Sequence, residues 1–238
     1  KVRFRFGYPE KIGGWIKNNE NNYLGTCRAL HPWVALDGTQ FVGVGTHLKY
    51  YLLEGGAFYD ITPLRLTTSA GDVAFLTGAD TLNGAITAAA ESIVLTSVSG
   101  FPPTGRIKIG SEIITYAAIS SATLIGCARG QSGTTAASHL DNAAVSCTTV
   151  KVTDSNHGAL DNDFVTYTDA ATLGGNITAA VLNQEYQIVT IVDDNTYLIE
   201  ARSVQTMADI TTTNGLEPTL VFSTTSDSGT GGSATVGA

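Results

Sequence analysis

The chain has 238 residues, of which 43% are hydrophobic and only 14% are charged, and its formal net charge is −8. This length suits one to three small domains, and the many Gly, Thr and Val residues are typical of a β-rich globular protein. No apolar run is long enough to span a bilayer, so stable membrane insertion is not expected. The acidic balance argues against tight binding to nucleic acid, because Lys and Arg that neutralise phosphates supply most of that affinity.

The charge is unevenly distributed along the chain. Residues 1–65 carry 8 Lys and Arg against 5 Asp and Glu, a balance of +3, whereas residues 66–238 carry 5 against 16, a balance of −11. Eleven of the 19 aromatic residues also lie within the first 65 residues. We therefore place a change of composition near Arg65, between a mildly basic, aromatic part and an acidic part rich in Thr and Ala.

The first part of the chain predicts a series of antiparallel strands. Residues 2–6 alternate apolar and polar side chains, which indicates a strand, and Gly7, Tyr8 and Pro9 are expected to break it. Four short apolar runs follow after residue 30. They occupy residues 33–36, 41–45, 48–53 and 58–61.

Turn residues separate these four runs. Asp37 and Gly38 give the strongest hairpin signal of the chain, since a tight hairpin turn needs a positive φ that Gly adopts at little cost. Turns are also expected at 45–46 and 54–56, and Pro63 is expected to end the last strand because it lacks a backbone donor.

Four strands joined by tight turns form an antiparallel meander, and a meander of this length corresponds to one blade of a β-propeller. A propeller needs about 4–8 blades, because a single blade cannot bury both of its faces. The remaining 173 residues (238 − 65) do not repeat the pattern. We therefore expect either that the partner blades lie outside this sequence, which would then be a segment of a longer protein, or that the meander docks on other subunits.

Five stretches of this part resemble one known family. They are residues 4–15 (FRFGYPEKIGGW), 27–33 (CRALHPW), 35–38 (ALDG), 43–49 (GVGTHLK) and 59–65 (YDITPLR). Their order and spacing look like the start of the tail nozzle, or tail tubular protein B, of short-tailed bacteriophages. The resemblance implies a propeller-containing subunit of a hexameric ring at the distal end of the tail, which closes and then conducts the genome. It implies no catalytic residues, and this chain departs from the family in ending long before a complete propeller is encoded.

With residues 1–75 assigned to the N-terminal strands and the blade, residues 76–149 predict a first small module of the β-barrel or sandwich type. The Ala-rich residues 79–90 have helix propensity, which their Thr and Gly weaken. Residues 101–116 (FPPTGRIKIGSEIITY) and 124–139 (LIGCARGQSGTTAASH) resemble a small β module of phage tail and fibre proteins, where it serves decoration or interaction. Strands are expected at 92–95, 106–109, 112–116 and 123–125.

Residues 150–222 predict a second small β module, whose last two strands are expected to form a hairpin across Asp193, Asp194 and Asn195. Two stretches, HGALDNDFVTY and LNQEYQIVTIVDDNTYLIEA, resemble the β module called the first catalytic cysteine half-domain in ubiquitin-activating enzymes, which also occurs in phage tail proteins. The resemblance implies a scaffold and no ubiquitin chemistry. Residues 223–238 have the small, polar composition of a linker. The strands are expected at 150–153, 164–167, 186–192 and 197–201.

One stretch resembles the surroundings of a serine nucleophile. Ser132 lies within Gly-Gln-Ser-Gly, and His139 and Asp141 follow closely. Catalysis needs a base and an orienting carboxylate beside the Ser, but the Gly-x-Ser-x-Gly motif is absent, and we interpret the stretch as a Gly/Ser turn. Residues 126–135 are Gly-rich, yet they lack the ending of a phosphate-binding loop and offer only Arg129 as a cation. No catalytic or cofactor-binding residues are therefore expected.

Metal binding also finds little support in the sequence. The runs Asp161-Asn162-Asp163 and Asp193-Asp194-Asn195 offer oxygen ligands for Ca²⁺, but neither has the spacing of a calcium loop. Side chains that hydrogen-bond their own backbone are the simpler interpretation. No two histidines have helical ligand spacing, and no metal site is expected. The histidines are His31, His47, His139 and His157.

The cysteines Cys27, Cys127 and Cys147 are odd in number and form no Cys-x-x-Cys pair, so a zinc or redox site is not expected. Pairing of Cys127 with Cys147 stays open beside the preferred interpretation as buried free thiols. Several aromatic residues of the first part could form a platform for sugars, although packing in a core or subunit interface is preferred. These residues are Trp15, Trp33, Tyr50, Tyr51, Phe58 and Tyr59.

These observations and the resemblance together predict a virion structural protein without enzymatic activity, a subunit of the phage tail nozzle that assembles in the bacterial host cytoplasm. Expected partners are further copies in a ring, tail adaptor and tail fibre proteins, and genomic DNA that passes an acidic wall without specific binding. The host surface is a further candidate partner. The alternative is a glycan- or receptor-binding module of a tail fibre or spike. A depolymerase would need paired carboxylates in a groove, which the sequence does not reveal.

Overall fold

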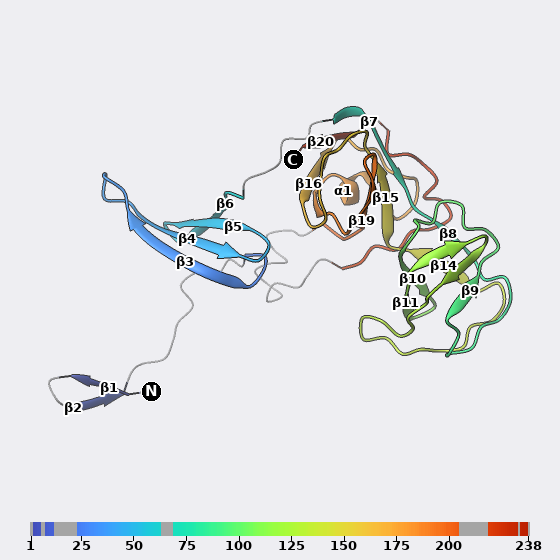
Figure 1. Cartoon of the computed structure of the whole chain (residues 1–238), viewed down its shortest axis with the longest axis horizontal. Helices are drawn as coiled ribbons and strands as arrows, with labels where there is room; N and C mark the ends of the chain where they lie inside the picture. Colours follow the sequence, from blue (N-terminus) through green and yellow to red (C-terminus); the bar gives the residue numbers. More distant parts are fainter. Residues whose placement is uncertain are drawn as a thin grey trace. The chain divides into compact units, whose positions relative to one another are not determined.

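The computed structural model describes residues 2–5, 8–11, 23–62, 69–204, 219–232 and 234–237. These residues form an all-β structure of antiparallel sheets, in which the one described helix is α1 (Ala179–Leu182). The chain divides into two compact units (Figure 1). The first contains Lys1–Pro63 and Thr206–Leu216, and the second contains Leu64–Gln205 and Glu217–Ala238.

The first unit begins with a two-stranded hairpin of β1 (Val2–Arg5) and β2 (Tyr8–Lys11), in which Arg5 lies opposite Tyr8. The strand expected at 2–6 is therefore present, but the chain enters a second strand at Tyr8 where a break was predicted. Pro9 is compatible with this strand because either strand of a two-stranded hairpin can direct a missing N–H outward.

Four antiparallel strands in sequential order form the predicted meander. Gly38 at its first turn has a φ of +88°, and the Thr39 amide donates to the Asp37 carboxylate over 2.9 Å, which confirms the predicted turn. The first strand covers residues 27–34 where 33–36 was predicted, because the Ala35 amide donates to the Thr39 carbonyl and leaves Leu36 in the turn. The strands are β3 (Cys27–Val34), β4 (Gln40–Thr46), β5 (Tyr50–Glu54) and β6 (Ala57–Asp60). The expected stop at Pro63 lies outside the described residues.

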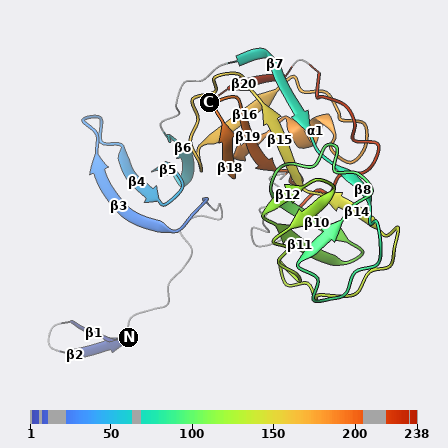
Figure 2. The same ribbon diagram turned by 45° about the vertical axis from the view of Figure 1, so that its right-hand side comes forward.

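The second unit contains a seven-stranded sheet that curls into a half-barrel around α1 (Figures 1 and 2). Its outermost strands, β17 and β18, are separated in the chain only by Ile188 and Val189. The two ends of the sheet are therefore consecutive pieces of one chain. In sheet order the strands are β17 (Glu185–Gln187), β16 (Phe164–Thr168), β20 (Ala234–Gly237), β7 (Ser69–Leu76), β15 (Thr149–Thr153), β19 (Thr196–Glu200) and β18 (Thr190–Asp193).

Apolar side chains inside the curl form what we call the large-sheet core. It contains Phe75 and Tyr167 in edge-to-face contact, and its helix buries Val181 and Leu182. Thr178 caps α1 by accepting a hydrogen bond from the Val181 amide. The predicted strands at 150–153 and 164–167 and the turn across residues 193–195 are confirmed. The strand predicted at 186–192 is divided between β17 and β18, so only its second part belongs to the hairpin.

Two smaller sheets are built from the residues between β7 and β15, and they enclose a separate small-sheet core. Isolated bridges from Leu82 to Leu95 and from Thr115 to Ala128 link the sheets at both sides. No helix forms at 79–90, where β8 and turns stand. One sheet has the order β11 (Glu112–Tyr116), β10 (Gly105–Ile109), β14 (Ala144–Cys147) and β8 (Ala79–Thr81); the other has β12 (Ala118–Ser120), β13 (Thr123–Ile125) and β9 (Ser92–Val94).

The sequence predicted two modules that follow one another along the chain. In the structure, the residues of one core instead lie on both sides of the other core in the sequence. The small-sheet core uses residues 82–147, within the predicted module 76–149. The large-sheet core uses Val73 and Phe75 as well as residues 150–236, so the predicted boundary at 75 separates β7 from the sheet to which it belongs. The linker predicted at 223–238 is wrong, because β20 pairs with both β16 and β7 in the middle of the large sheet.

The segment before β20 joins the two cores. The Ser223 hydroxyl donates to the Gly78 carbonyl over 2.6 Å and accepts from the Cys147 amide over 3.0 Å. The buried Asp227 carboxylate accepts hydrogen bonds from the amides of Gly175, Asn176, Ile177 and Thr224, at 2.8–3.1 Å. Composition alone suggests a linker here because these small residues act through backbone contacts that only the folded chain supplies.

Candidate assembly surface

The residues around Ser132 do not form a catalytic triad. Ser132 is exposed, at a φ of +53°, in a turn. His139 Nε2 lies 2.8 Å from Glu112 Oε2, and Asp141 accepts from the amides of Gly84 and Asn142. The base and the carboxylate that catalysis would need are thus engaged with other groups, which agrees with the interpretation as a turn.

Glu112, which sequence reasoning missed, is the centre of this region. Its side chain is buried, and it accepts two hydrogen bonds of 2.8 Å from the Arg129 guanidinium and one of 3.1 Å from each of the Gly130 and Ala137 amides. Burial by itself raises the pKa of Glu112, but the hydrogen bonds from Arg129, His139 and the two amides outweigh it and lower the pKa to about 2. Glu112 therefore holds the surrounding loops as a buried anion.

Arg129 is correspondingly unsuited to phosphate binding. Besides its pair with Glu112, its guanidinium donates to the carbonyls of Thr87 and Ala137, both at 2.6 Å. Arg129, the one cation of the Gly-rich residues 126–135, is engaged in hydrogen bonds that connect two loops to β11. This stretch is therefore a structural element.

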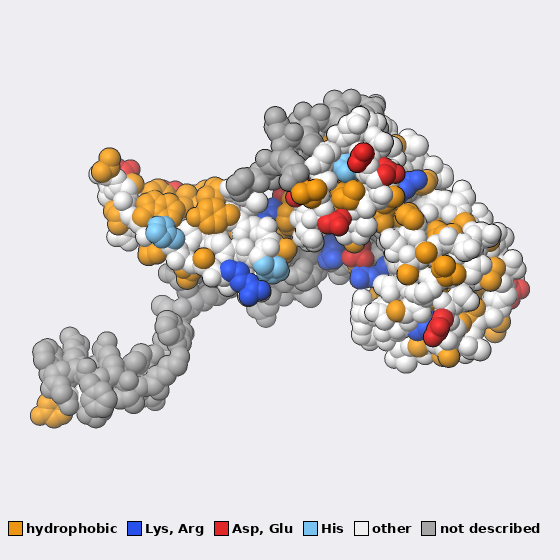
Figure 3. Space-filling view, in the orientation of Figure 1, with side chains coloured by type: hydrophobic (Ala, Val, Ile, Leu, Met, Phe, Trp, Pro, Cys, Tyr) orange, Lys and Arg blue, Asp and Glu red, His pale blue; other side chains and the backbone are white. Residues whose placement is uncertain are grey.

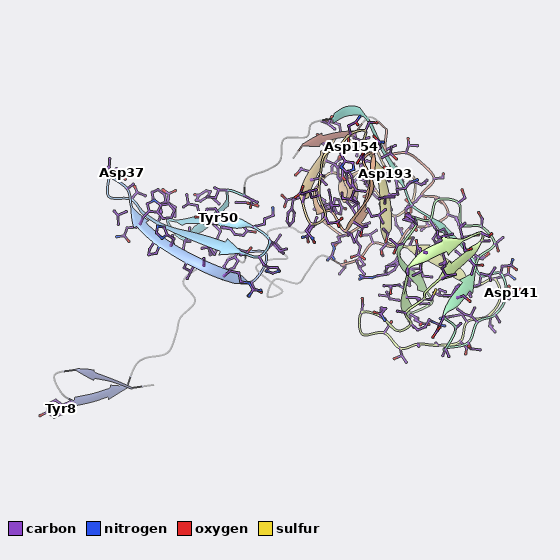
Figure 4. The ribbon with its side chains drawn as sticks, viewed as in Figure 1. Tyr8, Asp37, Tyr50, Asp141, Asp154 and Asp193 are labelled. Atoms are coloured by element: carbon purple, nitrogen blue, oxygen red, sulfur yellow. The ribbon has the colours of Figure 1, made fainter. Side chains whose placement is uncertain are left out.

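The two acidic runs accept hydrogen bonds from backbone amides: Asp163 and Asp193 bind neighbouring residues, as the sequence suggested, whereas Asp161 binds a residue of the distant strand β18. Asp161 accepts from the Ile191 amide at 2.6 Å, and Asp163 accepts from the Leu160 amide at 2.9 Å. Asp193 accepts from the Asn195 amide at 2.8 Å. Asp154 and Asp193 both lie in the large-sheet part (Figure 4). Among the described residues, no group of three or more His, Cys, Asp or Glu side chains is arranged to hold a metal ion.

The remaining histidines have structural contacts. His157 is buried; its Nδ1 accepts from the Ala159 amide and its Nε2 lies 2.9 Å from the Asp193 carbonyl. His47 Nδ1 accepts from the Thr26 amide over 2.9 Å. His31 stacks on Trp33, with ring centroids 5.8 Å apart.

All three cysteines are free thiols, so Cys127 and Cys147 do not pair. Both lie in the small-sheet core. Burial raises the pKa of Cys127 to about 11 and that of Cys147 to about 12. At neutral pH these thiols are protonated and therefore poor nucleophiles and metal ligands.

Four aromatic residues of the meander and His31 gather on one side of the sheet, which we call the aromatic face. Cross-strand pairs place them together, and Trp33 stacks on its partner Phe41 at 5.6 Å and 25°. Trp33, Tyr50 and Tyr59 are 37%, 39% and 52% exposed. The aromatic face consists of His31, Trp33, Phe41, Tyr50 and Tyr59. Trp15 of the sequence-based set lies outside the described residues.

Gly43 explains how the large rings fit on this face. A Cβ atom at Gly43 would lie 2.6 Å from the Tyr50 hydroxyl and 3.2 Å from the Trp33 ring, so both side chains lie over the glycine. Gly inside a strand often marks such a close approach. This glycine is the sequence signal that could have located the site.

The opposite side of the same sheet carries what we call the aliphatic face, consisting of Leu30, Val34, Val42, Val44 and Leu53. Leu30 and Val34 are each 64% exposed, whereas Val44 is buried. A shallow hollow of about 470 Å³ lies at one end of the sheet and is lined by Val42 and Leu53 together with Thr39, Gln40, Glu54, Gly55 and Gly56. Hydrophobic side chains cover much of the meander surface that Figure 3 shows. Phe58 and Tyr51, also on this side, are covered in part by Tyr23.

The two edges of the meander are less suited to pairing than its faces. The hydrogen bond from Ala35 to Thr39 fixes which amides of β3 point outward, and Pro32 occupies one of these outward positions without an N–H. On the other edge, β6 has only four residues, and the Thr62 amide after it donates to the Asp60 side chain over 3.0 Å. The exposed apolar faces are therefore the surfaces of the meander that are ready for contact.

Comparison of the sequence with models of protein families found no match, and comparison with curated proteins found none. None of the helices in the described ranges is long and apolar enough to cross a membrane.

Proposed function

We propose that this chain is a virion structural protein, a subunit of the tail nozzle ring of a short-tailed bacteriophage, in which the meander is a propeller blade. The observation that carries the proposal is a four-stranded meander whose two faces both expose large apolar side chains while its edges are short or blocked. Blades of a propeller pack through their faces and leave short protected edges. The five stretches that resemble the nozzle family, which lie within residues 4–65, add to this support.

The second unit is, in this proposal, an arm inserted into the ring-forming part. Ser69 at the start of β7 lies opposite Val236 of β20, so the chain of this unit leaves and returns at neighbouring points. Such proximity of ends is what lets a domain be inserted without disturbing its host. The small sheets stand between β7 and β15, whose neighbours Leu76 and Lys151 also pair, so one insertion lies inside another.

The proposed mechanism is assembly followed by conduction, without enzymatic activity, cofactor or metal. About six copies would form the ring, in contact with tail adaptor and fibre proteins, and genomic DNA would pass without specific binding. The arm would be available to the fibres or the host surface.

A glycan-binding module of a fibre or spike is the second candidate, favoured by the exposure of Trp33 and Tyr50. Sugars stack on free ring faces, however, and Trp33 is already stacked with both His31 and Phe41. This arrangement favours packing against another apolar surface over sugar binding.

Immunogold labelling of the particles of a phage that encodes this chain tests the proposal, with antibody raised against residues 77–222 and a search for the chain in the particles by mass spectrometry. Label at the distal end of the tail is expected. Label confined to fibres or spikes would support the glycan-binding candidate instead. Particles that contain no copy of the chain, intact or disrupted, would overturn the structural proposal.

A further inference from the structure

We propose that the outer surface where the small sheets meet the large sheet binds an oxyanion group, a phosphate or a carboxylate, of an acidic polysaccharide. This surface, which we call the basic junction, consists of Arg106, Lys108, Lys151 and Arg202 around Glu200. The oxyanion chemistry follows from these side chains. A polysaccharide as the source of the oxyanion rests on the proposed function, in which this unit is available to the host surface.

Strand pairing brings the basic junction together from both sheets. Val150 points into the large-sheet core, so Thr149 and Lys151 lie on the outer side of β15. Glu200 is directly opposite Thr149 in the register and therefore lies on the same side, diagonal to Lys151. The Thr149 hydroxyl accepts a hydrogen bond from the Arg106 amide over 3.1 Å, which holds β10 of the small sheet against this surface.

Glu200 shows that two of the cations are arranged around an oxyanion. Its Oε1 lies 2.9 Å from Nη1 of Arg106, and its Oε2 lies 3.1 Å from Nη2 of Arg202. The Glu200 side chain is 14% exposed, whereas those of Arg106 and Arg202 are 28% and 38% exposed. The carboxylate is thus more covered than the two guanidiniums around it, which stay open to solvent.

The donors of the two arginines are only partly used. In the part of the chain that the structure describes, each guanidinium contacts Glu200 alone, and the buried Nε of Arg106 has no hydrogen-bond partner. A guanidinium carries several N–H donors in one plane and can bind two oxyanions at once. The remaining donors are therefore available to a second oxyanion beside Glu200.

The charge of the basic junction is not balanced. Residues 66–238 contain five Lys and Arg, and all of them except Arg129 lie here. Lys108 is two residues from Arg106 on the same side of β10 and lies 5.0 Å from the centroid of the Phe222 ring, while Lys151 forms no ion pair with a described carboxylate. Four cations around one described carboxylate leave a charge of +3. A link between the sheets needs only one cation, so the surplus favours an anionic ligand.

An acidic polysaccharide suits this site better than nucleic acid. Arg binds phosphate and carboxylate groups alike through parallel N–H donors. DNA gains its affinity from many phosphates along an extended basic surface. Here the cations are confined to one patch within residues 66–238, whose charge balance is −11. A polysaccharide with separated charges places one oxyanion at a time over such a patch.

Three variants of the full chain test the site by calorimetric titration with poly(glycerol phosphate) and with polygalacturonate, which separate a phosphate source from a carboxylate source. Arg202→Gln and Lys151→Gln remove cations, and Glu200→Gln removes the internal carboxylate. Arg28→Gln, on the exposed part of β3, is the matched control because it removes one positive charge outside the site. Arg106 stays unchanged, since it also joins the two sheets. Neutral dextran and a short DNA duplex are the comparison ligands, and circular dichroism verifies folding.

The wild type is expected to bind at least one acidic polymer and not dextran, with an affinity that falls as salt is added. Arg202→Gln should weaken binding about tenfold, because it removes charge-assisted hydrogen bonds. Lys151→Gln should weaken it about threefold, and Glu200→Gln should strengthen it about threefold, since its carboxylate competes for the same guanidiniums. This gain separates a binding site from a purely structural ion pair. If Glu200→Gln does not fold, Arg202→Gln compared with Arg28→Gln decides.

A folded wild type that binds neither acidic polymer would overturn the inference, as would equal losses of affinity in Arg202→Gln and Arg28→Gln. Tighter binding of the DNA duplex than of either polymer would overturn the assignment to a polysaccharide. In each of these cases, label at the distal end of the tail would leave the proposed function standing. Particles that lack the chain would overturn the proposed function, while a measured loss of binding specific to Arg202→Gln would still support the site.

Discussion

The meander and the second unit solve the problem of exposed sheet surface in opposite ways. In the second unit the large sheet curls until its outer strands β17 and β18 are consecutive in the chain, and bridges close the small sheets side to side. In the meander, only Val44 and Tyr51 are buried among the described hydrophobic residues. Curled sheets bury one face within themselves, whereas an open four-stranded sheet needs another layer to bury its faces. The second unit thus encloses apolar cores of its own, whereas the meander leaves large apolar side chains exposed on both faces.

The two regions also differ in how they use charge. The second unit buries Glu112 with Arg129 and His139, and Asp227 with backbone amides, to fix loops around a core. The meander buries Lys49, whose ammonium lies 2.6 Å from the partly exposed Asp60 carboxylate. Substitutions should therefore have their largest effects in the second unit and smaller ones in the meander.

The largest effect is expected for Val236→Asp. Val236 is fully buried in the large-sheet core, where an unpaired carboxylate should destabilise the second unit by about 4 kcal/mol or more. The adjacent Thr235→Asp is the control, because its side chain points to the other side of β20 and should cost less than about 1 kcal/mol. Hydrogen exchange of the β7 and β16 amides measures the destabilisation that each of the two variants causes. Equal protection in the two variants would mean that β20 is not part of the core.

Glu112→Gln should destabilise the small-sheet core by about 3–5 kcal/mol, since it leaves the buried Arg129 guanidinium without its anion. The control is Glu91→Gln, an exposed carboxylate that should matter by less than about 0.5 kcal/mol. Urea denaturation monitored by hydrogen exchange of the β10 and β11 amides measures the destabilisation that each variant causes. An effect no larger than that of Glu91→Gln would contradict the role assigned to Glu112.

Acid should weaken the same region. The pKa of Glu112 is lowered from 4.5 to about 2 in the folded chain, so its contribution to the free energy of unfolding is complete above pH 4.5 and is lost as the pH falls toward 2. The loss should reach about 3 kcal/mol. Denaturation at several pH values should show this decline in the wild type and not in Glu112→Gln. The same slope in both proteins would assign the acid sensitivity to other carboxylates.

The smallest effect is expected in the meander, for Asp60→Asn. Removing the charged partner of Lys49 should lower the protection of β5 and β6 by about 2 kcal/mol. Asp37→Asn, in the exposed hairpin turn, is the control and should leave these strands unchanged, since an amide oxygen can still accept from Thr39. Hydrogen exchange with mass spectrometry measures both variants. A loss of hydrogen-exchange protection that also appears in the second unit would contradict the expected difference between the two regions.

Local patterns predicted much of this fold. The Asp37-Gly38 turn, the meander and the hairpin across residues 193–195 follow from side-chain alternation and turn residues, which act within a few positions of each other. The pattern missed β8, β12 and β14, because short strands in Ala-, Ser- and Thr-rich sequence have little periodicity. Ser132 was rightly interpreted as a turn residue, while the Glu112 centre beside it was missed.

The sequence by itself determined the all-β class, the compositional change near residue 65 and the order of the strands in the meander. Only the tertiary structure decided that β20 completes the sheet that β7 begins, and that Arg129 and His139 meet on Glu112. The physical reason is the separation along the chain between the residues that interact. Alternation and turn chemistry act between neighbours in the chain, whereas strand closure and the burial of a charge join residues far apart, whose partners are defined only once the sheets have formed.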